Sequence, residues 1–554
     1  MNRLGSMNRL GRENVTMAHK ALFSPASKSK SADTMNEANG RAYAFSPEHA
    51  LAQYAATGTF NQTYYAHEVE QLQKVLDLAS KVDPEFVAKT AVYCREKGLM
   101  KDMPAFLTAY LAARDVRLLA SVFPRVIDNG KMLRNFVQII RSGVVGRKSF
   151  GSAPKRLARA WFANRVPDAI FRQSLGSEPS MKDIIKLVRP SPKNADGAVD
   201  TMREALYGYL IGKDVAREKL PASVQAFETF KKERGDIPDV PFEMLTALDL
   251  NTDRWTAIAK RMSWTQLRMN LNTLHRHGVF GDESMVSFVA SKLRDPELVR
   301  RARVFPFQLL AAFKAAKSDM PPELTMALQE AMEIAIENVP KVEGKIFLCP
   351  DVSGSMLSAA PGFRQGATSA VRCVDVAALI SSAFLRRNTS AEVIPFSDDV
   401  VKMPRRLNPL DSVMTNAQYL AGLPSGGTAC SAPLRHLNDE RAKGDLVIYV
   451  SDNMSWTDFA KVNDAKSGLA SWLGIGTRAT VMAEEWDRFR GRNPNAKLVL
   501  IDIQPYGSTQ MHERADVLNV GGFSDSVFDV ISLFAKGELG ADHWVGAIKS
   551  VSLA

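Results

Sequence analysis

Residues 345–356 of the chain read KIFLCPDVSGSM, and this stretch decides the fold of the C-terminal half. The run KIFLC is short, apolar and typical of a buried strand. Asp351, Ser353 and Ser355 follow it at alternating positions, and Gly354 eases the turn off the strand. A carboxylate and two hydroxyls placed in this way can converge on one cation. Hard oxygen ligands of this kind favour magnesium, manganese or calcium over zinc.

Further apolar runs and helical stretches follow this strand in alternation. The runs are EVIPF at 392–396, DLVIYV at 445–450 and KLVLIDI at 497–503, and the helical stretches lie at 372–387 and 479–489. Strands that alternate with helices predict a parallel sheet covered on both faces. Ligands of such sheets lie at the carboxyl ends of the strands. We therefore predict an α/β, Rossmann-like domain over residues 341–554, with its site where KIFLC ends.

Two later loops supply the remaining candidate ligands. SGGT at 425–428 brings the hydroxyl of Thr428, and SDN at 451–453 brings the carboxylate of Asp452. Together with Asp351, Ser353 and Ser355, the order and separations are similar to the metal-ion-dependent adhesion site (MIDAS) of von Willebrand A domains. In those domains the five positions bind a divalent ion directly or through water. Because only two of the five are carboxylates, we expect the ion to stay positive and to keep a position open for an acidic ligand.

Other interpretations of DVSGS are weaker. The two serines could cap the next helix while Asp351 merely ends a strand, but three loops in the right order on strand ends favour a metal site. A phosphate-transferring aspartate needs a second carboxylate two residues on, where Ser353 stands. A metal-dependent nuclease needs a second carboxylate cluster or a general base, and the sequence offers neither. We therefore expect a binding protein and no enzyme.

The first half of the chain has a helical pattern. From about residue 46 to residue 338, apolar residues recur at three- and four-residue spacing, with short breakers between segments. Many medium helices joined by short turns predict an all-α helical-repeat, HEAT-like domain over residues 41–340. Residues 1–40 lack periodicity and predict a mobile arm. The segment MNRLG occurs twice in that arm and carries no functional inference.

Positive charge is concentrated in the helical half. The 554 residues carry a formal charge of +11, but residues 344–554 contain 21 Lys and Arg against 22 Asp and Glu. The excess therefore lies in the first half, which would attract a polyanion. The stretch from Arg141 to Lys193 alone has 12 cations and three acids.

Within that stretch, residues 181–189 predict an amphipathic helix with its cations on one face. Repeated cations without acidic partners are typical of a surface that binds a phosphate backbone. The alternative is a solvated helix face. The candidate RNA-binding residues are Lys182, Lys186, Arg189, the earlier group Lys155, Arg156 and Arg159, and His275, which could instead pack at a helix end.

Cysteine usage and hydropathy indicate the compartment. The four cysteines are scattered, with no CxxC spacing and no clustered histidines, which argues against disulfides or a zinc site. The N-terminus lacks the apolar core of a signal peptide, and no apolar run is long enough to span a membrane. We expect a cytoplasmic protein.

A helical array followed by an A-type domain resembles the Ro autoantigen family, TROVE-domain RNA-binding proteins of animals and many bacteria, in its bacterial or phage type. The DVSGSM and SDN stretches fit that family's A domain. Similar stretches in the first half are GTFNQTYY at 58–65, YCREKG at 93–98, KDMPAF at 101–106, KDIIK at 182–186 with Arg189-Pro190, and LNTLHRHGVF at 271–280.

The resemblance implies a ring of helical repeats whose two ends are joined by the A domain. It further implies a monomer that binds Y-like RNAs and the single-stranded 3′ ends of misfolded or structured RNAs in RNA quality control, beside an exoribonuclease or an RNA-repair enzyme. Lys182, Lys186 and Arg189 would belong to the family's basic helix. Val188-Arg189 stands where the family frequently has a polar residue and His. The alternative function is a metal-dependent protein-interaction scaffold without nucleic acid.

Overall fold

The computed structural model describes most of the chain, in ranges separated by short gaps. These are residues 30–57, 68–194, 196–233, 235–304, 306–316, 318–360, 371–423, 426–458, 479–504, 506–522, 525–539 and 542–553. The repeated MNRLG, the family-like stretch at 58–65 and Ser425 lie outside the described residues.

In the N-terminal part, the described residues form two short strands and then helices. Their bounds are β1 (Thr34–Met35), β2 (Arg41–Ala44), α2 (Pro47–Thr57), α3 (Glu68–Lys81), α4 (Pro84–Glu96), α5 (Asp102–Leu111), α6 (Val116–Val126), α7 (Gly130–Ser142), α8 (Ser152–Ala163), α9 (Pro167–Arg172), α10 (Met181–Val188), α11 (Thr201–Leu210), η1 (Arg217–Lys219), α12 (Ala222–Glu233), α13 (Phe242–Leu245), α14 (Thr252–Arg261), α15 (Trp264–Arg276), η2 (Val279–Gly281), α16 (Glu283–Leu293), α17 (Pro296–Ala302), α18 (Pro306–Ala315), α19 (Pro322–Ala335) and η3 (Ile336–Asn338).

The C-terminal part alternates strands and helices. Its elements are β3 (Ile346–Pro350), η4 (Gly354–Leu357), α20 (Cys373–Arg387), β4 (Glu392–Val393), α21 (Val413–Ala421), α22 (Ala432–Asp439), β5 (Leu446–Ser451), α25 (Val481–Arg492), β6 (Lys497–Asp502), β7 (Ser508–Thr509), β8 (Val517–Gly521), α26 (Asp525–Lys536) and α27 (His543–Lys549).

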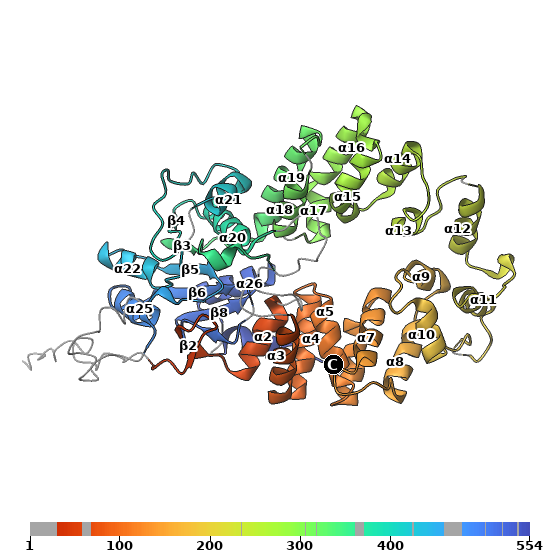
Figure 1. The fold of residues 1–554 in the computed structure, drawn as a ribbon, viewed down its shortest axis with the longest axis horizontal. Coiled ribbons are helices and arrows are strands. Elements are labelled where there is room, and N and C mark those ends of the chain that lie inside the picture. The colour runs from red at the N-terminus through yellow and green to blue at the C-terminus, as the bar shows by residue number, and fades with distance from the viewer. Residues whose placement is uncertain are drawn as a thin grey trace, which may run out of the picture.

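The helices form a curved array in which each packs mainly on helices one to three places along the chain. For example, α4 contacts α5 and α6, and α5 contacts α7. In Figure 1 the array leaves the A domain through α2–α9, turns at α10–α12 and returns through α13–α19. Its return end contacts the A domain through α18 on α20 and α19 on α21. The predicted fold class, a ring of helical repeats followed by an α/β domain, is confirmed.

The A domain is built on a five-stranded parallel sheet in the order β4-β3-β5-β6-β8. Successive strand residues point to opposite faces, so the sheet feeds two cores. Leu348 and Ile448 share one core with α20 and α26, and Cys349 and Tyr449 share the other with α22 and α25. Helices on both faces explain why the strands are continuous apolar runs.

The N-terminal strands are part of the A domain, which corrects one expectation. β2 pairs with β7, with Tyr43 opposite Thr509, and β1 pairs with β2. Residues 34–35 are therefore a strand inside the arm that was predicted to be mobile up to residue 40, and residues 41–44 pair with the A domain although they were assigned to the helical domain. The Tyr43 side chain is fully buried in the A-domain core. The sequence could not reveal this pairing, because the partner strand lies more than 450 residues away. The remainder of the predicted arm, residues 1–29, lies outside the described residues.

The C-terminal helix returns to the start of the array. The indole Nε1 of Trp544, on α27, donates to the Tyr93 hydroxyl over 3.3 Å. The Lys89 ammonium donates to the Lys549 carbonyl over 2.8 Å, and the Lys549 ammonium pairs with Glu48 at 2.7 Å. The last helix therefore fastens α2 and α4 to the A domain.

One buried carboxylate contributes to the other junction of the ring. Asp375, in the first turn of α20, pairs with Lys314 of α18 at 2.6 Å and with Arg372 at 2.9 Å, and its side chain is 1% exposed. Burial opposes its ionisation, but hydrogen bonds from Arg372 and Lys314 outweigh burial and hold the pKa of Asp375 below its usual value.

Among the described residues, no helix is long and apolar enough to cross a bilayer.

Candidate functional site

The first predicted ligand, Asp351, follows directly on the central strand β3. Its backbone N–H donates to the Val450 carbonyl over 3.0 Å, which continues the β3–β5 ladder by one residue. One carboxylate oxygen accepts from the Ser353 N–H over 2.8 Å, and the other from the Ser451 hydroxyl over 2.6 Å. The carboxylate is 0% exposed. Strand and loop together therefore fix its orientation.

The two serines turn back towards this carboxylate. The Ser353 and Ser355 hydroxyl oxygens lie 3.3 Å apart, both buried, at the start of the short helix η4. The Gly354 N–H donates to the Gly426 carbonyl over 2.9 Å. This bond joins the DVSGS loop to the loop that carries Thr428.

Thr428 and Asp452 complete the predicted set. They are 1% and 0% exposed. Asp452 accepts from the Met454 N–H with one oxygen over 3.2 Å. Its second oxygen and the Thr428 hydroxyl have no hydrogen-bond partner within the described part of the chain. Buried polar atoms normally find partners, so these two oxygens, beside two more hydroxyls and a carboxylate, fit a hard divalent cation.

The electrostatics of these loops are those of two acids buried side by side. Burial, followed by the charge of Asp452, raises the pKa of Asp351 to about 7. Burial likewise raises the pKa of Asp452, and the Ser355 hydroxyl offsets part of that increase. A cation between them would remove this penalty. Among the described residues, no group of three or more His, Cys, Asp or Glu side chains could hold a metal, so the hydroxyls are essential to the proposed coordination.

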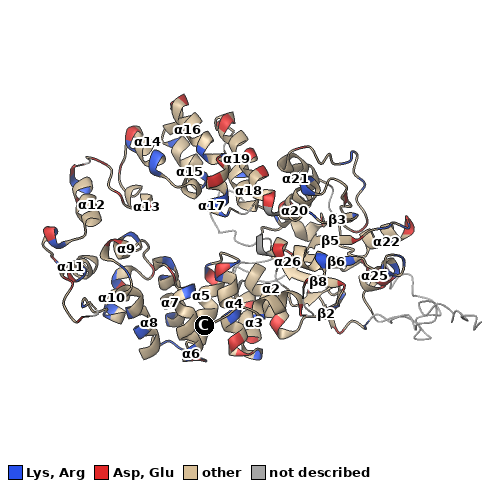
Figure 2. Cartoon of the chain, turned by 180° about the vertical axis from the view of Figure 1, so that it is seen from behind, with Lys and Arg blue, Asp and Glu red and all other residues tan. Residues whose placement is uncertain are grey.

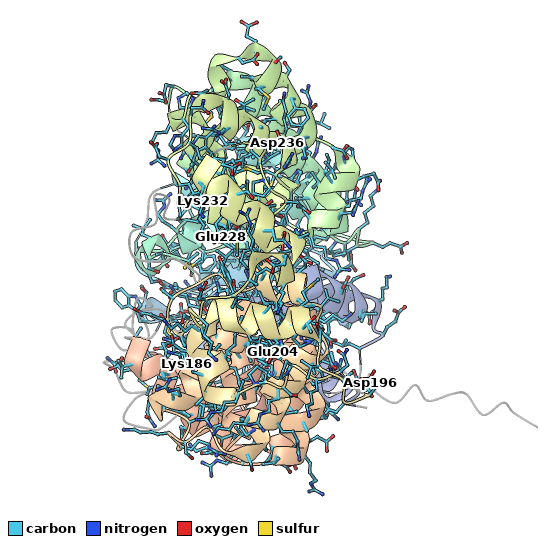
Figure 3. The ribbon with its side chains drawn as sticks, turned by 90° about the vertical axis from the view of Figure 1, so that its right-hand side faces the viewer. Lys186, Asp196, Glu204, Glu228, Lys232 and Asp236 are labelled. Carbon is cyan, nitrogen blue, oxygen red and sulfur yellow. The ribbon has the colours of Figure 1, made fainter. Side chains whose placement is uncertain are left out.

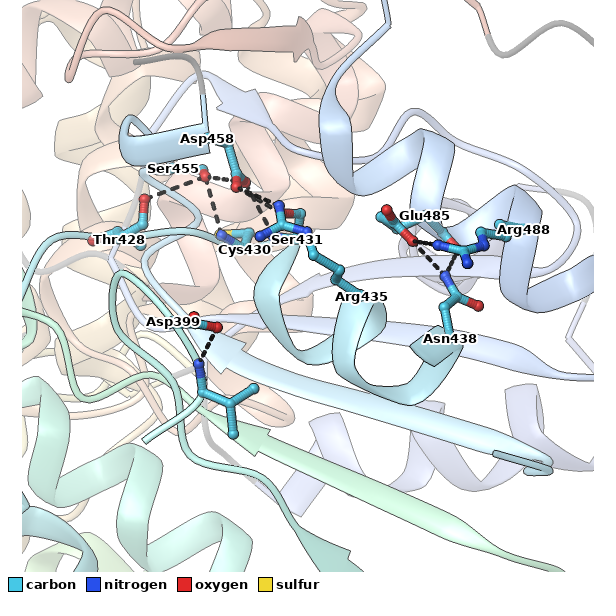
Figure 4. Close-up of polar contacts among 11 residues, drawn as sticks. Asp399, Thr428, Cys430, Ser431, Arg435, Asn438, Ser455, Asp458, Glu485 and Arg488 are labelled. Atoms are coloured by element: carbon cyan, nitrogen blue, oxygen red, sulfur yellow. Dashed lines mark hydrogen bonds and ion pairs between the residues drawn. The ribbon is translucent and has the colours of Figure 1, made fainter. Parts of the chain in front are cut away.

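A second polar network clamps the Thr428 and Asp452 loops together (Figure 4). Asp458 accepts from the Ser431 N–H at 3.0 Å, the Ser431 hydroxyl at 2.6 Å and the Ser455 hydroxyl at 2.8 Å. The Thr428 carbonyl accepts from the backbone N–H groups of residues 456 and 457, each over 3.1 Å. Ser431 follows Thr428 by three residues and Ser455 follows Asp452 by three, so Asp458 joins the two ligand loops.

Sequence reasoning missed three residues of this site. Ser451 orients Asp351, and Asp458 links the loops. Asp502 ends β6 in register with Ser451, is 0% exposed, and has no hydrogen-bond partner for either oxygen among the described residues. Burial, followed by the charge of Asp452, raises the pKa of Asp502 well above its usual value. The position of Asp502 at the end of a predicted strand could have identified it as a candidate site residue. Nothing in the sequence indicated Asp458.

The predicted basic helix is α10, and local sequence explains its limits. Ser180 and Asp183 form a capping box at its start. Ile184 and Val188 are buried in the array, whereas Lys182 and Lys186 are exposed. The chain leaves the helix at Arg189 in a left-handed conformation with φ of 50°. Burial of the apolar face therefore turns the cations outward.

Helix α8 packs against α10 and extends the basic surface. Figure 2 shows Lys and Arg on both helices. The side chains of Lys155, Arg156, Lys182, Lys186 and Arg189 make no ion pair with any residue that the structure describes. Arg159 differs, because its guanidinium donates to the Val188 carbonyl at the end of α10 over 2.6 Å. Arg159 therefore also fastens the two helices to each other.

Two features limit this surface. Helix α11 contacts α10, and Figure 3, which views the turn of the array, shows the acidic residues Glu204 on α11 and Glu228 on α12 in the same region of the molecule as Lys186. His275 does not belong to it. It lies on α15, in the returning limb of the array in Figure 1, 22% exposed and paired with Asp319 at 3.0 Å. The structure brings the other six candidate residues together on α8 and α10 and leaves His275 apart.

Comparisons with known proteins agree with this architecture. Residues 345–535 match the model of the Ro60 vWA domain and residues 201–319 that of the TROVE domain. The RNA-binding protein RO60 of Deinococcus radiodurans is 24% identical over 539 residues, which cover 91% of this chain and 95% of that protein. The RNA-binding protein RO60 of Caenorhabditis elegans is 23% identical over 269 residues, 47% of this chain and 38% of that protein.

A solved structure has the same fold. The crystal structure of the Deinococcus radiodurans RO (RSR) protein matches with a TM-score of 0.59 at 21% identity, over 89% of this chain and 100% of that one. The two domain models together span more than half of the chain, in the order in which the structure places a helical array and an A domain. The chain therefore belongs to the Ro protein family.

Proposed function

We propose that this protein is a noncoding-RNA-binding scaffold without catalytic activity, which takes Y-like RNAs and the single-stranded ends of misfolded or structured RNAs in RNA quality control. The observation that carries the proposal is the cluster of cations on α8 and α10, which form no ion pair with the residues that the structure describes. The relatives named above are RNA-binding proteins. We further propose a monomeric ring, acting in the cytoplasm beside an exoribonuclease or an RNA-repair enzyme.

Physical chemistry supports phosphate as the target of α8 and α10. The cations stand on helices whose other faces are buried, so their positions are fixed before RNA arrives. Lys and Arg contacts to phosphate release counterions, which makes binding steeply dependent on salt and nearly independent of sequence. The acidic residues of α11 and α12 would confine a polyanion to α8 and α10.

Charge reversal tests this proposal. We expect Lys182→Glu with Lys186→Glu to weaken binding of a hairpin RNA with a single-stranded 3′ tail by about 10-fold or more and to flatten its salt dependence. A matched control reverses Lys402 and Lys443, two exposed lysines of the A domain, and changes the net charge equally. Equal affinities of the two double variants in a filter-binding assay would refute α10 as the RNA surface.

We also propose that Asp351, Ser353, Ser355, Thr428 and Asp452 hold a divalent cation, with Mg²⁺ as the first choice and Mn²⁺ or Ca²⁺ as alternatives. The bound ion would supply positive charge and an open coordination position for an acidic group. The free Asp452 and Thr428 oxygens support this proposal. They also favour a second candidate function, a metal-dependent protein-interaction scaffold in which a partner's carboxylate binds the ion.

A thermal shift measures the proposed ion directly. A ligand that binds only the folded state raises the melting temperature. We expect Mg²⁺ or Mn²⁺ to raise that of the wild type, but not that of Asp351→Asn. Asp439→Asn, at an exposed residue of α22, should respond like the wild type. An identical response of all three proteins would refute the site.

A further inference from the structure

Two large apolar side chains are exposed beside the proposed metal centre. Leu357 follows Ser355 by two residues and Trp456 follows Asp452 by four, and each is 44% exposed. The proposed ligands in the same loops are 5% exposed or less. Each of these two ligand loops therefore places buried oxygens next to one exposed apolar side chain.

The Trp456 indole lies over the loop that carries Thr428. A Cβ built on Gly427 would come within 2.9 Å of the indole Cζ2, so the ring covers the backbone next to Thr428. The backbone N–H of Trp456 donates to the Thr428 carbonyl and so fixes the base of the side chain. The Gly354–Gly426 hydrogen bond holds the loop that leads to Leu357. We call Leu357 and Trp456 the apolar rim of the metal centre.

The flank beyond Gly426 is acidic. A Cβ built on Gly426 would lie 2.7 Å from a carboxylate oxygen of Asp398, and both Asp398 and Asp399 are exposed. A chain of phosphates reaching the ion would meet these charges at close range, whereas a single carboxylate could approach over the rim. The A domain also lacks the positive excess of the helices, with 21 Lys and Arg against 22 Asp and Glu in residues 344–554.

We propose that the apolar rim selects the ligand of the metal centre, which is a protein segment whose Asp or Glu is flanked by apolar side chains. The carboxylate would take the open position on the ion, and the flanking side chains would cover Leu357 and Trp456. Aromatic side chains such as Trp456 give large contact areas at small loss of conformational entropy. The inference rests on the proposed metal centre and adds which partner that centre accepts.

Short peptides in Mg²⁺ test the rim on the full-length protein. The probes are acetylated amides of Leu-Asp-Phe, Gly-Asp-Gly and Leu-Asn-Phe, measured by ligand-observed NMR, which detects millimolar affinities. We expect Leu-Asp-Phe to bind about 10-fold more tightly than Gly-Asp-Gly, since two apolar contacts are each worth a few-fold. Leu-Asn-Phe should not bind, and EDTA should release Leu-Asp-Phe.

Variants identify which residues make the difference. Trp456→Ala and Leu357→Ser should reduce the affinity for Leu-Asp-Phe towards that for Gly-Asp-Gly, whereas Trp456→Phe should keep most of it. Leu410→Ser is the matched control, because Leu410 is 74% exposed and lies at the far end of α20. Mn²⁺ affinity, read by electron paramagnetic resonance, should be the same in all four variants.

Each contrary result has a distinct meaning. Equal affinities for Leu-Asp-Phe and Gly-Asp-Gly, or an unchanged affinity in Trp456→Ala, would overturn the rim while Mn²⁺ binding stays intact. Decauridine could also displace Leu-Asp-Phe and lose its own binding in Trp456→Ala. That result would make the partner a nucleic acid and would overturn the proposal of a protein ligand. Failure of the wild type to bind Mn²⁺ would overturn the metal centre and the rim together.

Discussion

At the scale of single residues, the candidate metal centre is a set of oxygens held by a larger set of hydrogen bonds. The sequence places Asp351, Ser353, Ser355, Thr428 and Asp452 on three loops, and the structure brings those loops together. The sequence could not identify Asp458 as part of the site. An Asp six residues after Asp452 gives no sign that its carboxylate accepts a hydrogen bond from Ser431. Local spacing identifies groups that act on a shared ligand, whereas supporting contacts depend on the fold.

Asp458 gives a prediction at this scale. Asp458→Ala removes the acceptor shared by Ser431 and Ser455, so the two ligand loops lose this side-chain link and keep their backbone hydrogen bonds. Loss of a group that orients metal ligands typically lowers metal affinity by about 10- to 100-fold. We expect such a fall in Mn²⁺ affinity, measured by electron paramagnetic resonance. Asp458→Asn, which keeps one acceptor oxygen, should recover part of it.

The control for this experiment is Asp439→Ala, at an exposed acid on α22. It removes the same charge from the same domain without touching the loops. Unchanged Mn²⁺ affinity in Asp458→Ala would show that the other contacts hold the loops by themselves. A melting temperature measured without metal separates a general loss of stability from a loss of ion binding.

At the scale of elements, periodicity predicts the helices and the central strands well, because each buries its own apolar pattern. The α10 helix lies where the pattern and its capping residues place it. The short strands β1, β2 and β7 escaped prediction, because strands of two to four residues carry little pattern and depend on their partners. The partner of β2 is β7, far along the chain, and among the described strands β1 pairs only with β2. His275 lies in the last turn of α15, as the helix-end alternative predicted, but its contact with Asp319 in the loop between α18 and α19 could not be read from the sequence.

The α18–α20 junction gives a prediction about pH. The pKa of Asp375 is held below its usual value, so its pairs with Lys314 and Arg372 stabilise the fold fully above about pH 5 and are lost as pH falls below about 4. Asp375→Asn should lower the free energy of unfolding by about 1–3 kcal/mol at pH 7. The difference from wild type should shrink on acidification.

Urea denaturation at pH 7 and at pH 3.5 measures this effect. Asp399→Asn serves as the control, since Asp399 is exposed and forms no ion pair with the residues that the structure describes. A difference between Asp375→Asn and wild type that stays constant with pH would contradict the ionised state of Asp375 in the fold.

At the scale of the whole molecule, the ring depends on contacts between the two ends of the chain. Helix α27 packs on α4, and the Trp544 indole at its start is 1% exposed. Composition and periodicity indicated two domains but could not show closure, which is a property of long-range contacts. The resemblance to the Ro family supplied that expectation, and the arrangement in Figure 1 agrees with it.

Trp544 gives a prediction at this scale. Trp544→Ala should lower the free energy of unfolding by about 3–5 kcal/mol, as for other buried tryptophans. Because the lost contacts are those that join α27 to α4, the ring should also open more often, and small-angle scattering should report a larger radius of gyration. Trp456→Ala, the same substitution at a half-exposed site away from α27, should lower the free energy of unfolding less and leave the radius of gyration unchanged. A compact, stable Trp544→Ala protein would contradict the role of α27.

The pairing of β2 with β7 also sets an order of events during synthesis. Residues 41–44 leave the ribosome early, but their partner at residues 508–509 is made only after some 465 further residues. At about 5–20 residues per second this takes roughly half a minute to a minute and a half. During that interval the helices can fold while the ring stays open and an unpaired strand is exposed. If α8 and α10 form the RNA surface, as proposed, RNA could reach them on the nascent chain before the circle closes.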